Sequence, residues 1–306
     1  MITLISRAYL LLFSLLALAA LGSPAAAQSA ASGQVAVPSG HGDVVVLYAG
    51  SLTNMMEHDL GAAFDKATGF RFVGEGKGSK ALATEIKGKL RRADVFISAS
   101  PSVDEALMGA ANGDWLRWYA SFAEAPVVIG YNPKSRIASQ LTDASWPKVL
   151  SQPGLRLGRT DPKLDPKGSR TIELVQNAAR YYAMPGLVAQ ILGSEENNKQ
   201  IFPEQTLVGR LQSGQLDAGF FYSNEAAEEG IPYVTPPAAI DPKAEYTVGV
   251  LNGAPNGAGA EAFVTYLFSP DGQALLKRHG LTLLKPSISG DAGAVPAGLW
   301  AVLSQR

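Results

Sequence analysis

The residues best suited to binding chemistry in this chain are serines that follow glycine-rich turns. Ser51 follows Gly50, after an apolar run at 44–47 and before apolar positions at helical spacing. Gly50 permits a sharp strand-to-helix turn, and Ser51 is a good N-cap. The start of a helix presents unpaired N–H groups and the positive end of a dipole, so this turn is suited to a small anion. The alternative is that Ser51 only caps the helix.

A second serine, Ser79, stands in the same position of a second unit. A predicted strand at 70–75 runs into a turn containing Gly78, and an amphipathic segment follows. A third unit, with a short apolar strand at 93–98, comes next. Strands that alternate with helices predict a parallel, doubly wound α/β sheet, which binds ligands at the carboxyl ends of its strands. Ser51 and Ser79 are both predicted at such ends.

The loop at 160–170 combines two Asp-Pro pairs with Lys167-Gly168-Ser169, directly before a long predicted helix. Such a loop is either a rigid turn whose aspartates cap locally or part of a site at a helix start. A later apolar strand, at 217–222, ends in Tyr222 and is followed by Glu225.

The composition argues against several other classes of function. The chain has 306 residues, 26 Lys and Arg, 27 Asp and Glu, three His and no Cys. Thiolate metal sites are therefore excluded, and three widely separated histidines argue against a His-based metal site. The balanced charge points to no nucleic-acid or membrane-surface partner. His58 falls within a predicted helix, and neither serine has a Gly-x-Ser-x-Gly elbow, which argues against an exported hydrolase.

The N-terminus has the pattern of a secretory signal peptide. Arg7 precedes an apolar run at 8–21, and small residues follow up to Ala27. We predict a signal peptide at 1–27, cleaved after Ala27, and a flexible leader at 28–42. An uncleaved membrane anchor is the alternative, but the run is short for a span.

Several segments, taken in order, resemble a known family, the periplasmic molybdate/tungstate-binding proteins of ABC importers. The similarity covers nearly the whole chain after the leader, and Gly158-Arg159-Thr160-Asp161-Pro162 resembles the tungstate branch most. The segments that carry it are Tyr48-Ala49-Gly50-Ser51-Leu52, Gly78-Ser79, Ala93-Asp94-Val95-Phe96-Ile97-Ser98, Gly158-Arg159-Thr160-Asp161-Pro162, Asp165-Pro166-Lys167-Gly168 and Asp217-Ala218-Gly219-Phe220-Phe221-Tyr222.

The resemblance implies an α/β, two-lobe periplasmic-binding-protein fold of the class II type. Each lobe would be a mixed, mainly parallel sheet flanked by helices, with the ligand in the interlobe cleft. Lobe one would comprise 43–125 plus 239–306, and lobe two 126–238. The two crossover strands would lie at or near 127–131 and 246–251.

The resemblance also implies a set of ligand-binding residues. Lobe one would contribute Ser51 and Ser79 on turns containing Gly50 and Gly78, and lobe two the Lys167 backbone amide, an amide near Leu207 and the Tyr222 hydroxyl. Molybdate and tungstate only accept hydrogen bonds at neutral pH, so neutral donors and helix starts satisfy their oxygens. Such a site would reject protonated oxyanions, because their O–H would have no acceptor. Discrimination between molybdate and sulfate would then depend mainly on the size of the cavity.

Two departures from the family pattern concern charged residues. In the tungstate branch, carboxylates from lobe two can raise the coordination number of the metal above four. Asp165 matches the position of one such carboxylate, but the position of the second falls at or near Phe221, which cannot ligate. Glu225 lies close by in sequence. We therefore expect a four-coordinate oxyanion held by hydrogen bonds, with Asp165 structural. Lys167 and Arg170 could instead admit a carboxylate or phosphate ligand by charge pairing.

The predicted function is the exported, periplasmic substrate-binding component of an ABC importer. It would be a monomer without a cofactor or enzymatic activity, would bind molybdate or tungstate by hinge closure, and would deliver it to an inner-membrane ABC permease. One alternative is a binding protein for sulfate, thiosulfate or phosphate. The other is an exported hydrolase or metal enzyme.

Overall fold

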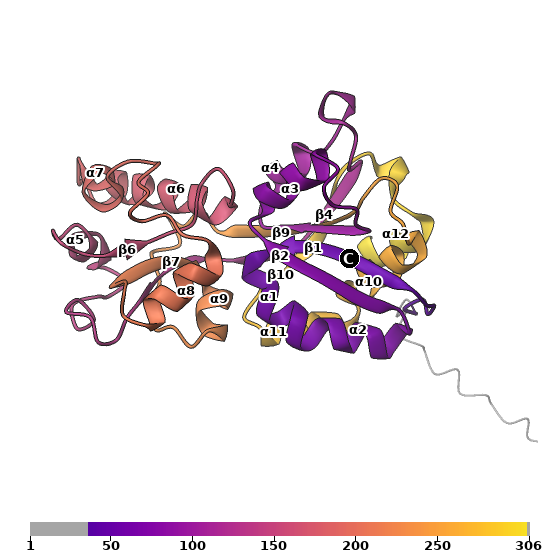
Figure 1. Ribbon diagram of the computed structural model, residues 1–306, viewed down its shortest axis with the longest axis horizontal. Coiled ribbons are helices and arrows are strands. Elements are labelled where there is room, and N and C mark those ends of the chain that lie inside the picture. Colours follow the sequence, from indigo (N-terminus) through magenta and orange to yellow (C-terminus); the bar gives the residue numbers. More distant parts are fainter. Residues whose placement is uncertain (1–35, 305–306) are drawn as a thin grey trace, which may run out of the picture. The chain divides into compact units, whose positions relative to one another are not determined.

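A computed structural model of the chain describes residues 36–304, which contain two β-sheets flanked by helices (Figure 1). The predicted signal peptide at 1–27 lies outside the described residues. The end of the predicted leader is described: Gly40 donates its N–H to the Thr68 carbonyl, and Val37 packs against the core. The last residues of the predicted leader are therefore held against the fold, and the leader at 28–42 stays a prediction.

The larger sheet has six strands in the order β10-β4-β9-β3-β1-β2. Their bounds are β1 Asp43–Ala49, β2 Arg71–Lys77, β3 Val95–Ser98, β4 Trp118–Ala125, β9 Ala244–Val250 and β10 Thr282–Gly290. Successive side chains of β1 point to opposite faces, as in any strand. Val46 and Tyr48 pack on one face with Phe64 and Phe263, and Leu47 packs on the other with Leu82, so both faces are buried.

Helices cover both faces of the larger sheet. Those that belong to it are α1 Thr53–Met55, α2 Gly61–Thr68, α3 Ser79–Lys87, α4 Pro101–Glu105, α10 Gly257–Phe268, α11 Pro270–Arg278 and α12 Ala297–Leu303. A π-helical turn, Met56–Leu60, joins α1 to α2. The predicted helix after Ser51 is thus confirmed, with an irregular turn in its middle.

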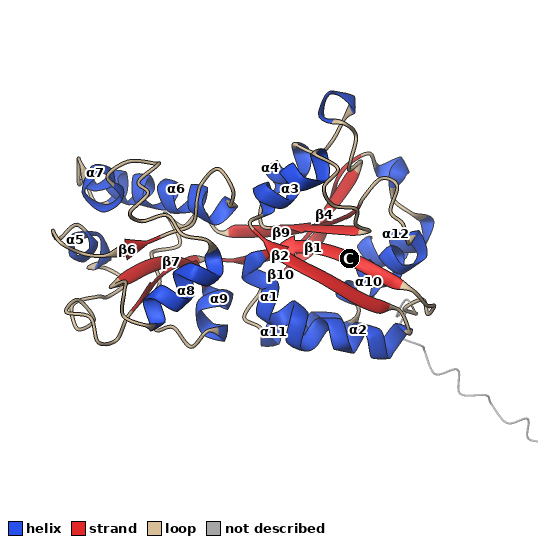
Figure 2. Ribbon diagram, viewed as in Figure 1, coloured by secondary structure: helices blue, strands red, loops and turns tan. Residues whose placement is uncertain are grey.

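The smaller sheet has four strands in the order β6-β7-β5-β8 (Figure 2). Its strands are β5 Val127–Tyr131, β6 Leu157–Gly158, β7 Ala218–Tyr222 and β8 Tyr233–Val234. Its helices are α5 Trp146–Leu150, α6 Pro166–Tyr181, α7 Leu187–Leu192, α8 Glu204–Gln212 and α9 Ser223–Glu228. Val128 and Phe221 pack against α8, whereas Ile129 and Phe220 belong to the cluster that contains the apolar side of α6.

The expectation that both sheets are mainly parallel is wrong, although both are mixed. Strand β1 pairs parallel with β2 and β3, and β6 pairs parallel with β7. The other pairings, β10 with β4, β4 with β9, β3 with β9, and β5 with β7 and β8, are antiparallel. The predicted βα units account only for the parallel part. The antiparallel part comes from strands that enter from distant parts of the chain.

The chain crosses between the two sheets at two points that are tied together. At one of them β4 ends at Ala125 and β5 begins at Val127, so only Pro126 separates them. The other crossing leads into β9. Asp241 Oδ1 accepts a hydrogen bond from the Val127 N–H, at 3.0 Å, and another from the Lys243 N–H, at 3.0 Å. The predicted lobe boundaries, at 125/126 and 238/239, fall at these crossings and stay a prediction.

Candidate functional site

Ser51 lies at the end of β1, in the short 3-10 helix Gly50–Leu52, and is 4% exposed. Its hydroxyl is 2.8 Å from the Tyr246 hydroxyl, and its carbonyl accepts from Asn224 Nδ2 at 2.9 Å. The helix has Ala49 as its N-cap and no side-chain cap. The prediction that Ser51 caps the helix is therefore wrong, because its hydroxyl is turned to β9 instead. This contact joins the turn to residues far away in sequence.

Ser79 begins α3, with Gly78 at the N-cap position, and is 1% exposed. Its oxygen accepts a hydrogen bond from the Ala99 N–H at 3.2 Å, so the hydroxyl proton remains for another acceptor. A side chain at Gly78 would collide with the Leu164 carbonyl and would approach Asp165. Glycine is thus required here because the 160–170 loop lies directly against this turn.

The loop before α6 is held by its own aspartate. Asp165 is the N-cap of α6, and its Oδ1 accepts from the Lys167 N–H at 2.8 Å. This supports the structural role expected for Asp165. The Lys167 amide is thus engaged by Asp165 in this structure, and its predicted contact with a ligand stays a prediction.

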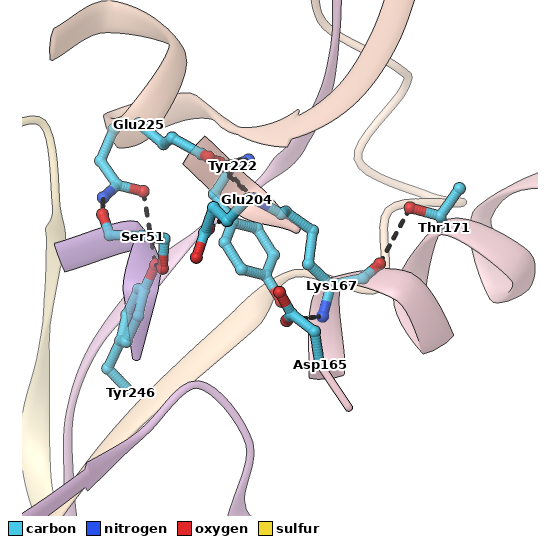
Figure 3. Close-up of polar contacts among 9 residues, drawn as sticks. Ser51, Asp165, Lys167, Thr171, Glu204, Tyr222, Glu225 and Tyr246 are labelled. Carbon is cyan, nitrogen blue, oxygen red and sulfur yellow. Dashed lines mark hydrogen bonds and ion pairs between the residues drawn. The ribbon is translucent and has the colours of Figure 1, made fainter. Parts of the chain in front are cut away.

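The side chain of Lys167 is the centre of a buried cluster of charges (Figure 3). Its Nζ donates to Glu204 Oε1 at 2.5 Å and to the two Glu225 oxygens at 2.8 and 2.6 Å. Lys167 is completely buried, and both glutamates are less than 9% exposed. The three N–H groups of the ammonium are therefore satisfied by carboxylates from α8 and α9.

The pKa values in the cluster follow from burial and from these partners. Burial alone would lower the pKa of Lys167, but the charges of Glu204 and Glu225 outweigh it and raise that pKa. Burial raises the pKa of Glu225, against the opposing effect of Lys167. The pKa of Asp165 is raised by burial and by the negative charge of Glu204. The carboxyls of Asp165 and Glu225 are thus harder to ionise than in water, and Lys167 remains charged.

Tyr222, at the end of β7, has a buried hydroxyl without a hydrogen-bond partner among the described residues. Its ring packs edge-on against Tyr246, and Lys167 Nζ lies 5.8 Å from its centre. Burial raises the pKa of Tyr222 well above its ordinary value, so its hydroxyl keeps its proton. A buried donor that lacks an acceptor is costly, and a bound acceptor would relieve this cost.

Two cavities flank Glu204. One, of about 320 Å³, is lined by Gly50, Ser51, Glu204 and Glu225 among others. The other, of about 470 Å³, is lined by Gly78, Thr160, Asp165 and Glu204 among others. A side chain at Gly50 would collide with the Glu204 carboxylate, whose Oε2 has no partner in the described structure. Glu204 therefore reaches from α8 to the turn that carries Ser51.

The amide of Leu207, which was predicted near the ligand, is used inside its own helix. The Leu207 N–H donates to the Pro203 carbonyl inside the first turn of α8, and its side chain is buried in the core. The donors that remain at the start of this helix belong to earlier residues, because only the first turn leaves its amides unpaired. Phe221 also faces the core. The position expected for a second carboxylate is thus apolar.

Glu204, Asn224 and Tyr246 also belong to the site but were not predicted from the sequence. Asn224 and Tyr246 bond to the Ser51 turn from 173 and 195 residues away. Glu204 stands at the start of α8, where an acidic residue is common for reasons unrelated to ligands. No local pattern distinguishes these residues, and only the Pro203-Glu204 helix start was a weak signal.

The site brings together hydroxyl donors and charged groups. Ser51, Ser79 and Tyr222 offer hydroxyl donors, and Lys167 provides positive charge balanced by its glutamates. In residues 36–304, no three His, Cys, Asp or Glu side chains are placed so as to hold a metal ion. The nearest partners of the two serines are hydroxyl and backbone groups, not a base.

Comparison with known proteins supplies the family. Residues 44–282 match the family described as bacterial extracellular solute-binding proteins. The chain belongs to this family. The family places this solute-binding protein in the periplasm or outside the cell. None of the helices described between residues 36 and 304 is long and apolar enough to cross a membrane.

Two relatives have names that state a ligand. A putative ABC transporter molybdenum-binding protein of Haloferax volcanii is 36% identical over 75% of this chain and 67% of its own length. A molybdate/tungstate-binding protein of Pyrococcus abyssi is 24% identical over 80% of this chain and 86% of its own.

A solved structure confirms the fold of this solute-binding protein. The periplasmic molybdate-binding protein of Azotobacter vinelandii superimposes with a TM-score of 0.63 and 21% identity, over 79% of this chain and 99% of that chain. The predicted α/β fold of two-lobe periplasmic binding proteins is therefore confirmed. We use "lobe one" for the part of the chain with the larger sheet and "lobe two" for the part with the smaller sheet.

Proposed function

We propose that this protein binds molybdate or tungstate between its two lobes and delivers the anion to an inner-membrane ABC permease. The observation that carries the proposal is the unpartnered Tyr222 hydroxyl, buried beside the turn of Ser51. Ser79 adds a second lobe-one hydroxyl whose proton is available. The names of the Haloferax and Pyrococcus relatives support the same ligand class.

Neutral donors suit these anions because every oxygen of MoO₄²⁻ or WO₄²⁻ is an acceptor. Hydroxyl donors from Ser51, Ser79 and Tyr222 would pair with them, and amides at the start of α8 would add to the set. Glu204 lines both cavities and its Oε2 has no partner among the described residues, so it could accept the O–H of a protonated anion. The donor set alone therefore does not reject protonated phosphate, and the panel of oxyanions decides between the two ligand classes.

The surrounding charges determine how a dianion can be tolerated. Lys80 Nζ donates to the Pro162 carbonyl and to Ser169, and Arg170 donates to the Pro242 carbonyl. Both cations lie near the buried carboxylates and offset them. Lys167 is not available for a ligand unless Glu204 or Glu225 is displaced, since these two glutamates already use it. This argues against a carboxylate or phosphate ligand that pairs directly with Lys167.

A panel of oxyanions tests the proposed function. Molybdate or tungstate should raise the melting temperature of the purified protein, because a ligand that binds only the folded state stabilises it. Sulfate, thiosulfate and phosphate should raise it less at equal concentration. Metal analysis after incubation with a mixture of the anions should find molybdenum or tungsten in the protein. A larger shift with sulfate or phosphate would overturn the choice of ligand.

The binding mode gives a separate prediction. Asp165 caps α6, and Glu204 Oε1 accepts a hydrogen bond from Lys167. Because both carboxylates are engaged in this way, we propose a four-coordinate oxyanion held by hydrogen bonds. Tyr222→Phe should then weaken binding by about 1.5–3 kcal/mol, as calorimetry would measure, and more than Asp165→Asn does. Tyr181→Phe, at an exposed tyrosine, is the matched control and should bind as the wild type does. X-ray absorption that reports more than four oxygen neighbours would instead indicate carboxylate ligation.

Export and delivery complete the proposal. Cleavage after Ala27 would release a periplasmic protein that begins at Gln28, and the intact mass of exported protein tests this. The protein would act as a monomer and not as an enzyme. The two lobes would close around the anion by rotation at the crossings, and the permease would recognise the closed form.

A further inference from the structure

His279 bridges two carboxylates that belong to different lobes. It follows α11 in lobe one, and its Nε2 lies 2.8 Å from Asp59 Oδ2. Its Nδ1 lies 2.8 Å from Glu228 Oε1, at the end of α9 in lobe two. The side chains of His279 and Glu228 are about nine-tenths buried, so water does not replace either partner.

This arrangement requires one proton more than a neutral imidazole carries. A neutral ring has one N–H donor and one bare nitrogen, whereas an ionised carboxylate only accepts. Both ring nitrogens of His279 face carboxylate oxygens. Either the imidazole is protonated and donates twice, or Glu228 is protonated and donates to it. In both cases the His279–Glu228 pair holds a proton that the neutral ring and the ionised acid lack.

We propose that closure of the lobes around a ligand is coupled to uptake of a proton by the His279–Glu228 pair. The bridge can form only when α9 lies against lobe one, as it does in this structure, where Asn224 of the same helix bonds the Ser51 carbonyl. When the lobes separate, Glu228 becomes hydrated and its pKa returns toward the ordinary value of about 4.3. The open pair therefore releases the proton at pH values where the closed pair keeps it.

The charged groups around the bridge are consistent with this direction. Asp59 also pairs with Arg278, at 2.9 Å, and so faces His279 as a carboxylate. Burial raises the pKa of Glu228 to about 7, against the lowering effect of His279, and Glu229 and Asp59 add to the rise. A proton held more tightly in the closed form stabilises that form at low pH. This stabilisation is lost as the pH rises through the pKa of the closed pair.

Calorimetry of the full mature protein with molybdate, in buffers of different ionisation enthalpy, tests the proposal. At pH 7.5, binding of molybdate to the wild type should be accompanied by uptake of a fraction of a proton at the bridge, at most about one. The affinity for molybdate should fall between pH 7 and 8.5 by up to about tenfold per pH unit. His279→Gln should remove that share of the uptake and flatten the pH profile. Glu228→Gln can donate to His279 without a bound proton, so it should keep tight binding at pH 8.5 and also lose the uptake.

His41→Gln is the matched control, because His41 is exposed and distant in sequence from the bridge, and it should behave as the wild type does. Asp165 and Glu225 can also exchange protons on binding, so only the difference between the wild type and His279→Gln is attributed to the bridge. Circular dichroism confirms that the variants fold. The proposal rests on the proposed function only because molybdate is the ligand used in the test. Failure of all oxyanions to bind would reject the proposed function. Binding with the same proton uptake in the wild type and in His279→Gln would reject the coupling.

Discussion

Replacement of Lys167 by methionine is expected to lower the free energy of unfolding by about 3–5 kcal/mol, because it leaves buried carboxylates without their cation. Lys167 is fully buried and is the hydrogen-bond partner of both Glu204 and Glu225. Methionine has a similar length but carries no charge. Urea denaturation of the wild type and the variant, followed by circular dichroism, would measure the difference.

Two further variants make this result specific. Lys163→Met removes a lysine whose ion pair with Glu196 is exposed, and it should cause no measurable change in stability. The triple variant Lys167→Met, Glu204→Gln, Glu225→Gln removes all three charges and should recover part of the loss, because no unpaired charge remains buried. Unchanged stability of Lys167→Met would show that the lysine is not the counter-ion of the two glutamates.

Loss of both lobe-one hydroxyls is expected to have the largest effect on binding. Ser51→Ala and Ser79→Ala should each weaken the binding of molybdate by about 1.5–3 kcal/mol, roughly ten- to more than a hundredfold in Kd, because each removes a hydrogen bond to a charged ligand. The double variant should bind more weakly than either single variant. Calorimetry at fixed pH and salt concentration measures these differences.

Ser151→Ala provides the control for the serine variants. The Ser151 hydroxyl donates to the Lys148 carbonyl at an exposed helix end, so its loss should leave the affinity for molybdate unchanged. Circular dichroism would confirm folding, since Ser79→Ala also deprives the Ala99 amide of its acceptor. Wild-type affinity in both Ser51→Ala and Ser79→Ala would show that the anion binds elsewhere.

Features that depend on neighbouring residues could be predicted from the sequence. The strand before Gly50, the start of α3 at Ser79 and the capping role expected for Asp165 follow from local apolar patterns and turn residues. The backbone environment of each is set within a few residues, so a single chain is enough to find it. Tyr222 was also placed correctly, at the end of its strand.

Features that depend on the crossings could not be predicted in the same way. The antiparallel directions of β4, β9 and β10 in the larger sheet depend on how the chain leaves and re-enters this sheet, which periodicity does not show. The capping alternative for Ser51 was wrong because its hydroxyl lies against that of Tyr246, a partner 195 residues away. Glu204 was missed for a related reason, since its partner Lys167 lies on another helix.

The carboxylate of Asp241, which accepts from an amide at each crossing, has a mechanical consequence. Two strands linked by a shared acceptor cannot bend independently, and the one-residue spacing at Pro126 leaves no slack for sliding. We therefore expect the lobes to rotate about one axis near the two crossings. Binding of the proposed ligand between the lobes would then change a single angle. A membrane partner that touches both lobes would respond to that one angle instead of to many independent changes of shape.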